Sequence, residues 1–454
     1  MKRLIGLQAV LALPLALTAC PSDDTGEDDT SNAATEGSDT GDATDGEDES
    51  GTDGTPAGCA GPSDTGARVE VPLSIDGDTT LSCDQVHVLT GITFVNSGTL
   101  TIEPGTTILG GAGSALVIDK GGRIDSQGTA DAPVVMTSIN VATGPARGDW
   151  GGLALIGTAP TNVGEGVAEG FADDPPTYGG DDAAHDCGSL TYTRVEWAGN
   201  EISPGNELNG ITFYSCGTAT TVDHVQVHMG LDDGIEMFGG SFSANNIVVT
   251  GAADDSIDCD QGFSGSLQDV FIHQDPTIGD NCLEWSNQGN DFAATPLNAP
   301  SIANMTCIGS GAGGDKSKGV TLKEGTQARI ANSLFANLTN DSVVLQNQAT
   351  QSQAEGGNVS FAGSHFCDGG SFIVDTDDED PDPAGWTSED FGAWVLGDGG
   401  GTDGTACGLG STEWGAPNAQ PAADGAPQGD SSYAGAVDPA GDDWTQESWI
   451  NYGV

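Results

Sequence analysis

Carboxylate side chains recur at matching places in three neighbouring segments of the sequence. The segments are GLDDGIEMFGG from residue 230, ADDSIDCDQG from residue 253 and GDNCLEWSNQG from residue 279. Their equivalent acidic residues are Asp232, Asp233, Glu236, Asp254, Asp255, Asp258, Asp280 and Glu284. Ca²⁺ prefers clusters of carboxylate and backbone carbonyl oxygens. The pattern therefore predicts a calcium site, provided that the fold stacks the three segments on one another.

Two other interpretations of these carboxylates remain open at the level of the sequence. In the first, they form a solvated acidic face without a ligand. In the second, the chain is a polysaccharide hydrolase or lyase, because glycosidases use paired carboxylates as acid and base. The catalytic candidates are then Asp232, Asp233, Asp254, Asp255 and His228. A lyase would also need a basic proton acceptor, for which the nearby residues are Lys316, Lys318, Lys323 and Arg329.

Five further segments align with one another and indicate how the carboxylates could be stacked. They read TVDHVQV, SANNIVV, SLQDVFI, SIANMTC and RIANSLF, and begin at residues 221, 243, 266, 301 and 329. Their fourth residues are His224, Asn246, Asp269, Asn304 and Asn332, separated by 22, 23, 35 and 28 positions. Short strands repeated at such periods are typical of a solenoid. We therefore expect an all-β, right-handed parallel β-helix in which the fourth residues line up at a bend.

The composition agrees with this fold and excludes some partners. The 454 residues include 70 glycines and only 6% aromatic residues, which favours short strands joined by turns and almost no helix. The net charge of −57 excludes binding to nucleic acid through a basic patch. It is equally unfavourable for binding an anionic sugar chain, whereas metal ions remain suitable ligands.

Several motifs resemble those of a known family. TLTIEPGT (99–106), RGDWGGLALIG (147–157), PGNELNGITF (204–213) and two of the acidic segments are similar to bacterial surface or secreted proteins with a pectin-lyase-like right-handed parallel β-helix. The likeness covers roughly residues 88–347. It implies the fold more firmly than any function, because most members of that family have no assigned activity.

The N-terminus has the layout of an exported protein. Residues 1–19 place Lys2 and Arg3 before a short apolar run, as in a secretory signal peptide. The run ends in Leu-Thr-Ala-Cys, which resembles the lipobox of bacterial lipoproteins, so Cys20 is expected to carry fatty acyl chains such as palmitate. Residues 21–66 contain fourteen acidic residues and no Lys or Arg. We expect residues 20–66 to be a disordered acidic linker.

These features together predict a location and a domain organisation. The β-helix is expected over residues 67–365 and an irregular acidic C-terminal cap over residues 366–454. The lipid anchor would hold the protein at the outer membrane or cell surface. We expect a monomer whose partner, beyond the membrane itself, is a polysaccharide or another surface protein.

The cysteines also fit an exported protein. Of the ten, those other than Cys20 are expected to be mostly paired, because disulfides form in oxidising compartments. Proximity in the sequence predicts the pairs Cys59–Cys83, Cys187–Cys216, Cys259–Cys282 and Cys367–Cys407. This assignment leaves Cys307 reduced and buried. The absence of a Cys-x-x-Cys spacing argues against a zinc site.

Overall fold

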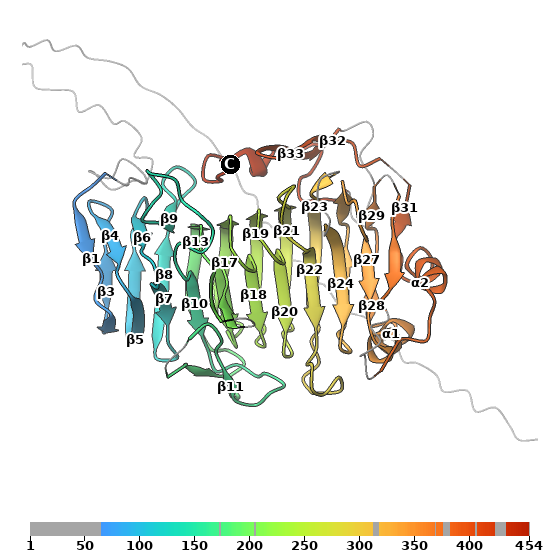
Figure 1. The fold of residues 1–454 in the computed structure, drawn as a ribbon, viewed down its shortest axis with the longest axis horizontal. Helices are drawn as coiled ribbons and strands as arrows, with labels where there is room; N and C mark the ends of the chain where they lie inside the picture. Colours follow the sequence, from blue (N-terminus) through green and yellow to red (C-terminus); the bar gives the residue numbers. More distant parts are fainter. Residues whose placement is uncertain are drawn as a thin grey trace, which may run out of the picture. The chain divides into compact units, whose positions relative to one another are not determined.

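The computed structural model describes residues 65–453, apart from 172–173, 204–205, 312–316, 368, 376–381, 405 and 423–432. Within this part of the chain, successive coils stack so that their strands pair in parallel (Figure 1). The predicted right-handed parallel β-helix is confirmed. The predicted signal peptide, Cys20 and residues 21–64 lie outside the described residues. Among the described helices, none is long and apolar enough to cross a membrane.

Two ladders of parallel strands, here called sheet A and sheet B, form the walls of the β-helix. Sheet B contains β2 (Ser74–Asp76), the first part of β5 (Ile92–Ile102), β7 (Ala115–Ile118), β10 (Leu153–Ile156), β16 (Ile211–Tyr214), β18 (Ile235–Phe238), β20 (Ile257–Asp260), β22 (Asn281–Ser286), β24 (Lys318–Lys323), β27 (Val343–Leu345) and β30 (Phe372–Val374).

Sheet A contains the remaining parallel strands. They are β1 (Arg68–Glu70), β3 (Thr79–Leu81), β4 (Val86–Leu89), the second part of β5, β6 (Thr107–Gly110), β8 (Gly122–Gln127), β9 (Val134–Ser138), β13 (Gly188–Glu196), β17 (Thr221–His228), β19 (Ser243–Thr250), β21 (Ser266–His273), β23 (Ser301–Ile308), β25 (Ala328–Ala331), β26 (Leu334–Ala336), β28 (Val359–Ser360), β29 (His365–Phe366) and β31 (Thr402–Asp403). Three antiparallel hairpins lie outside the ladders: β11 (Gly166–Val167) with β12 (Thr177–Tyr178), β14 (Asn200–Ser203) with β15 (Asn206–Leu208), and β32 (Leu409–Glu413) with β33 (Ala416–Pro421).

Alternate residues of each strand point into the β-helix and form its core. In sheet B, Ile235, Ile257 and Leu283 stack in register, and all three are buried. The next inward position carries Met237, Cys259 and Trp285, which are fully buried. This apolar stacking fixes the register, since a one-residue slip would turn every inward side chain to the outside.

The long strands of sheet A bend at the fourth residue of each repeat. These five residues have left-handed backbone conformations, with φ of 55° at His224, 53° at Asn246, 56° at Asp269, 55° at Asn304 and 50° at Asn332. The strand registers on both sides of the bend place them in one line along the axis. The predicted ladder is confirmed. Its composition follows from the backbone, because Asn and Asp tolerate this conformation better than other non-glycine residues.

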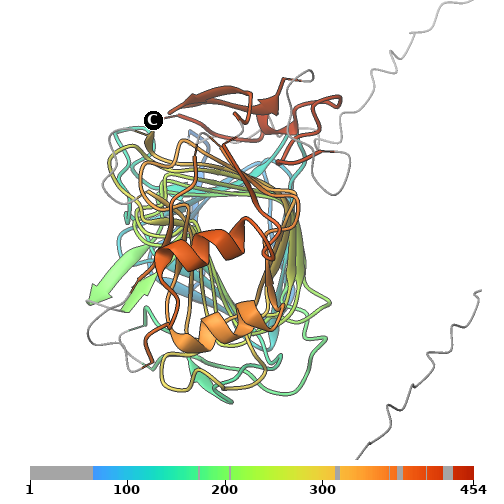
Figure 2. The ribbon, with the colours of Figure 1, turned by 90° about the vertical axis from the view of Figure 1, so that its right-hand side faces the viewer.

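The C-terminal part differs from the irregular cap predicted for residues 366–454. The coils continue through β30 and β31. The helices α1 (Gln348–Glu355), which precedes β28, and α2 (Ser388–Val395), between β30 and β31, cover the end of the β-helix (Figure 2). Phe391 and Val395 of α2 join the core there. Residues 433–453, called the C-terminal strap below, include a short 3₁₀ helix (Trp444–Gln446) and lie along the outer face of sheet A. The apolar side chains of Val248 and Phe271 point outward from this face. Trp449 of the strap packs in the same buried cluster, which shields them from solvent.

The disulfide pattern is partly as predicted. Cys187 pairs with Cys216, and Cys367 pairs with Cys407. Cys83 is disulfide-bonded, but Cys59 lies outside the described residues.

The predicted pair Cys259–Cys282 is wrong, as is a reduced Cys307. Cys282 bonds to Cys307, and Cys259 is free and buried. In the strand register Cys259 lies opposite Trp285, three residues beyond Cys282. Three residues of a strand span about 10 Å, whereas the Cα atoms of a disulfide lie within about 7 Å of each other.

Replacing Asn246 with valine tests the bend ladder. A β-branched residue is poorly suited to φ near 53°, so we expect Asn246→Val to lower the free energy of unfolding by about 1–2 kcal/mol. Asn245→Val is the matched control, because Asn245 is exposed on the same strand and has no positive φ. Urea unfolding measures both variants. Equal losses in the two would contradict a conformational role for the ladder.

Candidate metal centre

The turns that lead into β18, β20 and β22 carry a ladder of side-chain-to-backbone hydrogen bonds. The backbone N–H of Asp255 donates to Asp233 Oδ1 at 2.9 Å, and that of Asn281 donates to Asp255 Oδ1 at 2.6 Å. One coil earlier, the Asp233 N–H donates to Asn209 Oδ1 at 3.2 Å. Asp233 and Asp255 are only 8% and 5% exposed. Asp233, Asp255 and Asn281, which hold equivalent places in the three acidic segments, therefore form one row, and all three are buried.

Asn209 belongs to this row, although it was not among the predicted site residues. Its local sequence, Asn-Gly-Ile, matches Asp233-Gly-Ile one coil later. This matching tripeptide was the signal in the sequence that could have identified Asn209 as a member of the row. It is easily missed because a neutral amide in one repeat does not look equivalent to a carboxylate in the next.

A second row runs along the outer side of sheet B. The register places Glu236 opposite Asp258, and Asp258 opposite Glu284. Glu236 is only 7% exposed, although it points away from the core, and Asn209 Nδ2 donates to its Oε2. Glu284 accepts from Lys323 Nζ at 2.5 Å. The Oδ1 atom of Asp258 is shielded from solvent and has no hydrogen-bond partner.

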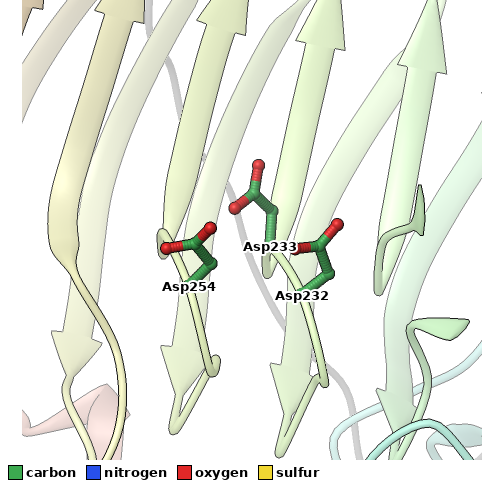
Figure 3. A group of neighbouring side chains, drawn as sticks. All are labelled: Asp232, Asp233 and Asp254. Carbon is green, nitrogen blue, oxygen red and sulfur yellow. The ribbon is translucent and has the colours of Figure 1, made fainter. Parts of the chain in front are cut away.

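The third row lies in the turns and is more open to solvent. It consists of Asp232, Asp254 and Asp280. Asp280 forms an ion pair with Lys318, with Nζ 3.2 Å from Oδ1. Figure 3 shows Asp232 and Asp233 on one turn and Asp254 on the next, with the three carboxylates on the same side of the coils.

The three rows combine into four triads of carboxylates. In each triad, one oxygen from every residue lies within 4.8 Å of the others. The triads are Asp232–Asp233–Asp254, Asp254–Asp255–Asp280, Asp233–Glu236–Asp258 and Asp255–Asp258–Glu284. The second and fourth repeat the first and third one coil later. All eight acidic residues singled out in the sequence are thus brought together.

Burial and mutual repulsion change the acidity of these groups. Burial, together with the neighbouring carboxylates, raises the pKa of Asp233, Glu236, Asp255 and Asp258 well above the usual range. Burial also raises the pKa of Asp260 to about 7. Two carboxylates 4 Å apart repel by about 1 kcal/mol in water and by about 4 kcal/mol near a protein surface. The inner residues therefore need protons or cations, and a fully solvated acidic face does not describe them.

The basic residues proposed for catalysis are occupied in other ways or lie elsewhere. His228 Nε2 bonds to the Gly453 carbonyl at 2.8 Å, and its Nδ1 bonds to Thr250 Oγ1 at 2.7 Å, so neither nitrogen is available to the carboxylates. Lys318 and Lys323 are paired with acidic residues. Arg329 belongs to sheet A, and Lys316 lies outside the described residues. Among the described residues near the triads, no free base accompanies the acids.

The fold and the site define a right-handed parallel β-helix whose turns carry stacked carboxylates. The family model of the pectate-lyase-like beta helix domain matches residues 73–416. The chain belongs to this family. The matched region is longer at both ends than the likeness found in the sequence motifs. No curated protein and no solved structure gives a significant match to the chain.

The raised carboxyl pKa values predict a specific dependence of stability on pH. In the presence of a chelator, the free energy of unfolding should increase as the pH falls from about 8 to about 6.5, because the folded state keeps protons that the unfolded state has released. Each such proton contributes about 1.4 kcal/mol per pH unit. Asp260, with a pKa of about 7, titrates inside this window.

The buried histidines contribute little in that window. Burial lowers the pKa of His228 and His273 to about 4, so both are neutral when folded. Their ordinary pKa of about 6.5 means that they gain protons on unfolding only near its lower end. Urea unfolding at constant ionic strength measures the effect. A free energy of unfolding that decreases on acidification over this window would show that the carboxylates do not titrate as inferred.

Proposed function

We propose that the protein is a divalent-cation-binding β-helix in which calcium stabilises the stacked coils. The observation that carries this proposal is Asp258. Its Oδ1 is shielded from water and accepts no hydrogen bond, yet Asp258 belongs to two triads at once. An unsatisfied buried carboxylate oxygen costs several kcal/mol unless a cation or proton meets it.

The donor set suits calcium better than the common alternatives. Every triad consists of carboxylates, and Ca²⁺ takes six to eight oxygen ligands in a flexible geometry. Zinc prefers nitrogen and sulfur ligands, and no His or Cys belongs to the four triads. Asp232, Asp233 and Asp254 would hold one ion, and Asp233, Glu236 and Asp258 another. The bound charge would replace the protons that the inner carboxylates otherwise retain.

The wider role that we propose is a binding or structural module on the cell surface. The acyl chains on Cys20 would anchor it in the membrane, and the acidic linker would hold the β-helix away from the lipid. A polysaccharide or another surface protein would be its partner. We do not propose an enzyme, because no basic partner accompanies the acids among the described residues. His228, Lys318 and Lys323 are paired with other groups, Arg329 lies in sheet A, and Lys316 lies outside the described part of the chain.

Calcium should raise the melting temperature of the wild-type protein relative to chelator at matched ionic strength. A ligand that binds only the folded state stabilises it by about 2.7 kcal/mol at a hundredfold excess over Kd. Asp258→Asn should reduce this gain, because it removes a ligand from two triads. The same variant should be more stable than wild type in chelator, because it also removes a repelling charge.

Asp131→Asn is the control, since Asp131 is an exposed acid outside the four triads. It should leave the calcium effect unchanged. Matched ionic strength is essential because monovalent salt also screens the repulsion. A wild-type melting temperature that responds to neither chelator nor millimolar calcium would refute the metal proposal. Protonation would then be what neutralises the inner carboxylates.

The anchor is tested separately. Cys20→Ala should move the protein from the membrane fraction to the soluble fraction, or leave an unprocessed precursor, because acyl chains provide the membrane affinity. Ser22→Ala is the control, since it changes the same segment without removing the thiol. Fractionation and detergent partitioning measure the outcome. Unchanged membrane association of the Cys20 variant would refute lipid anchoring.

A further inference from the structure

Two of the four triads contain residues from the outer side of sheet B, and they are related by one coil. The first inner triad is Asp233–Glu236–Asp258, and the second inner triad is Asp255–Asp258–Glu284. Each offers three carboxylate oxygens within 4.8 Å of one another, and the two triads share Asp258. The spacing of their oxygens therefore suits both triads to the same kind of cation.

Lys323 distinguishes the second inner triad from the first. Its Nζ atom lies 2.5 Å from Glu284 Oε2, and the two side chains are only 26% and 20% exposed. Among the residues that the structure describes, no lysine or arginine forms an ion pair with Asp233, Glu236 or Asp258. An ammonium group is thus bonded to a member of the second inner triad, and the described part of the chain supplies none to the first.

The strand register explains how Lys323 reaches this position. Glu284 on β22 pairs with Thr321 on β24, and Ser286 pairs with Lys323. Lys323 therefore lies two residues further along the adjacent strand, on the same face as Glu284. The strand spacing and the rise per residue place the two Cα atoms about 8 Å apart, which a lysine side chain can span. Because Thr321 is neutral, the row of acids ends at Glu284, and the lysine follows directly.

An ammonium is a better neighbour for a bound calcium ion than a second calcium ion would be. Cations at equivalent places of adjacent coils would be about one strand spacing apart, or about 4.8 Å. Coulomb energy is proportional to the product of the charges, so Ca²⁺ is repelled by an ammonium about half as strongly as by another Ca²⁺. Lys323 also carries its charge on the chain and needs no ion from solution.

We propose that the ammonium of Lys323 is the permanent cation of the second inner triad, so that the two inner triads together take one calcium ion, at the first. This inference rests on the proposed function, because it concerns how many ions the same carboxylates hold. Asp258 belongs to both triads and joins the bound ion to the ammonium. Removing the ammonium uncovers a second calcium site on the inner carboxylates.

The number of calcium ions bound per chain tests this assignment. Equilibrium dialysis at constant ionic strength, up to about 10 mM calcium, exceeds the Kd range of about 0.1–1 mM that is typical of extracellular calcium modules. Lys323→Met removes the charge and keeps an unbranched side chain, and it should bind one more ion per chain than wild type. In chelator it should melt at a lower temperature than wild type, because Glu284 loses its cation. Calcium should then raise its melting temperature by more than that of wild type.

Three variants serve as controls. Lys323→Arg keeps the positive charge and should bind as many ions as wild type. Lys120→Met should also bind as many, because Lys120 is a half-buried lysine that donates to Thr177 Oγ1 at 2.8 Å and contacts no triad. The double variant Lys323→Met with Glu284→Gln removes a ligand together with the ammonium, so it should lose the additional ion. If Lys323→Met stayed unfolded in calcium while the double variant folded, calcium would not replace the ammonium and the inference would be overturned.

The failures of the two proposals are distinguishable. If wild type binds calcium and Lys323→Met binds no additional ion, the cation sites stand and Lys323 only forms a structural ion pair. If neither protein binds calcium, both proposals are overturned. If only Lys323→Met binds calcium, the proposed function of the wild-type protein is overturned, and Lys323 is retained as the group that takes the place of an ion.

Discussion

Repulsion between carboxylates held one strand spacing apart is the constraint on which this structure depends. Parallel pairing places equivalent residues of adjacent coils about 4.8 Å apart. A repeat with an acid at the same position of each coil therefore builds a row of like charges. The register cannot shift to relieve this repulsion, because Ile235, Ile257 and Leu283 are stacked in the core beside it. The charge must instead be neutralised where it lies.

The rows are neutralised in different ways because their backbones differ. Where the turns meet the strands, the N–H groups of Asp255 and Asn281 donate to the side chain of the equivalent residue in the preceding coil. Within β18 and β20, the backbone groups already take part in parallel pairing, so Glu236 and Asp258 receive no such donor. Lys323 compensates Glu284 at one end of this row, and Asn209 donates to Glu236 at the other. Asp258 lies between these two ends and receives neither contact. Its Oδ1 atom is therefore the clearest indication of a cation in this row.

Much of this site could be predicted because it depends on periodicity. The eight acids and the bend ladder each repeat with the coil, and equivalent positions in a solenoid must stack. Asn209 was missed because an amide replaces the acid in its repeat. The cysteine pairs show a related limit: Cys282 bonds to Cys307, at a sequence separation of 25, although Cys259 is slightly nearer in the sequence.

The sequence by itself determined that the chain forms stacked β-helix coils, because short apolar strands of matching period can bury their inward side chains only by stacking. It also determined which acids share a row. Only the tertiary structure decided which of these acids are buried, because burial depends on the turns and on the segment between β10 and β13 that packs on sheet B. It likewise placed the C-terminal strap along sheet A, where the Gly453 carbonyl bonds to Nε2 of His228. Contacts of this kind join segments more than two hundred residues apart, and no local pattern encodes them.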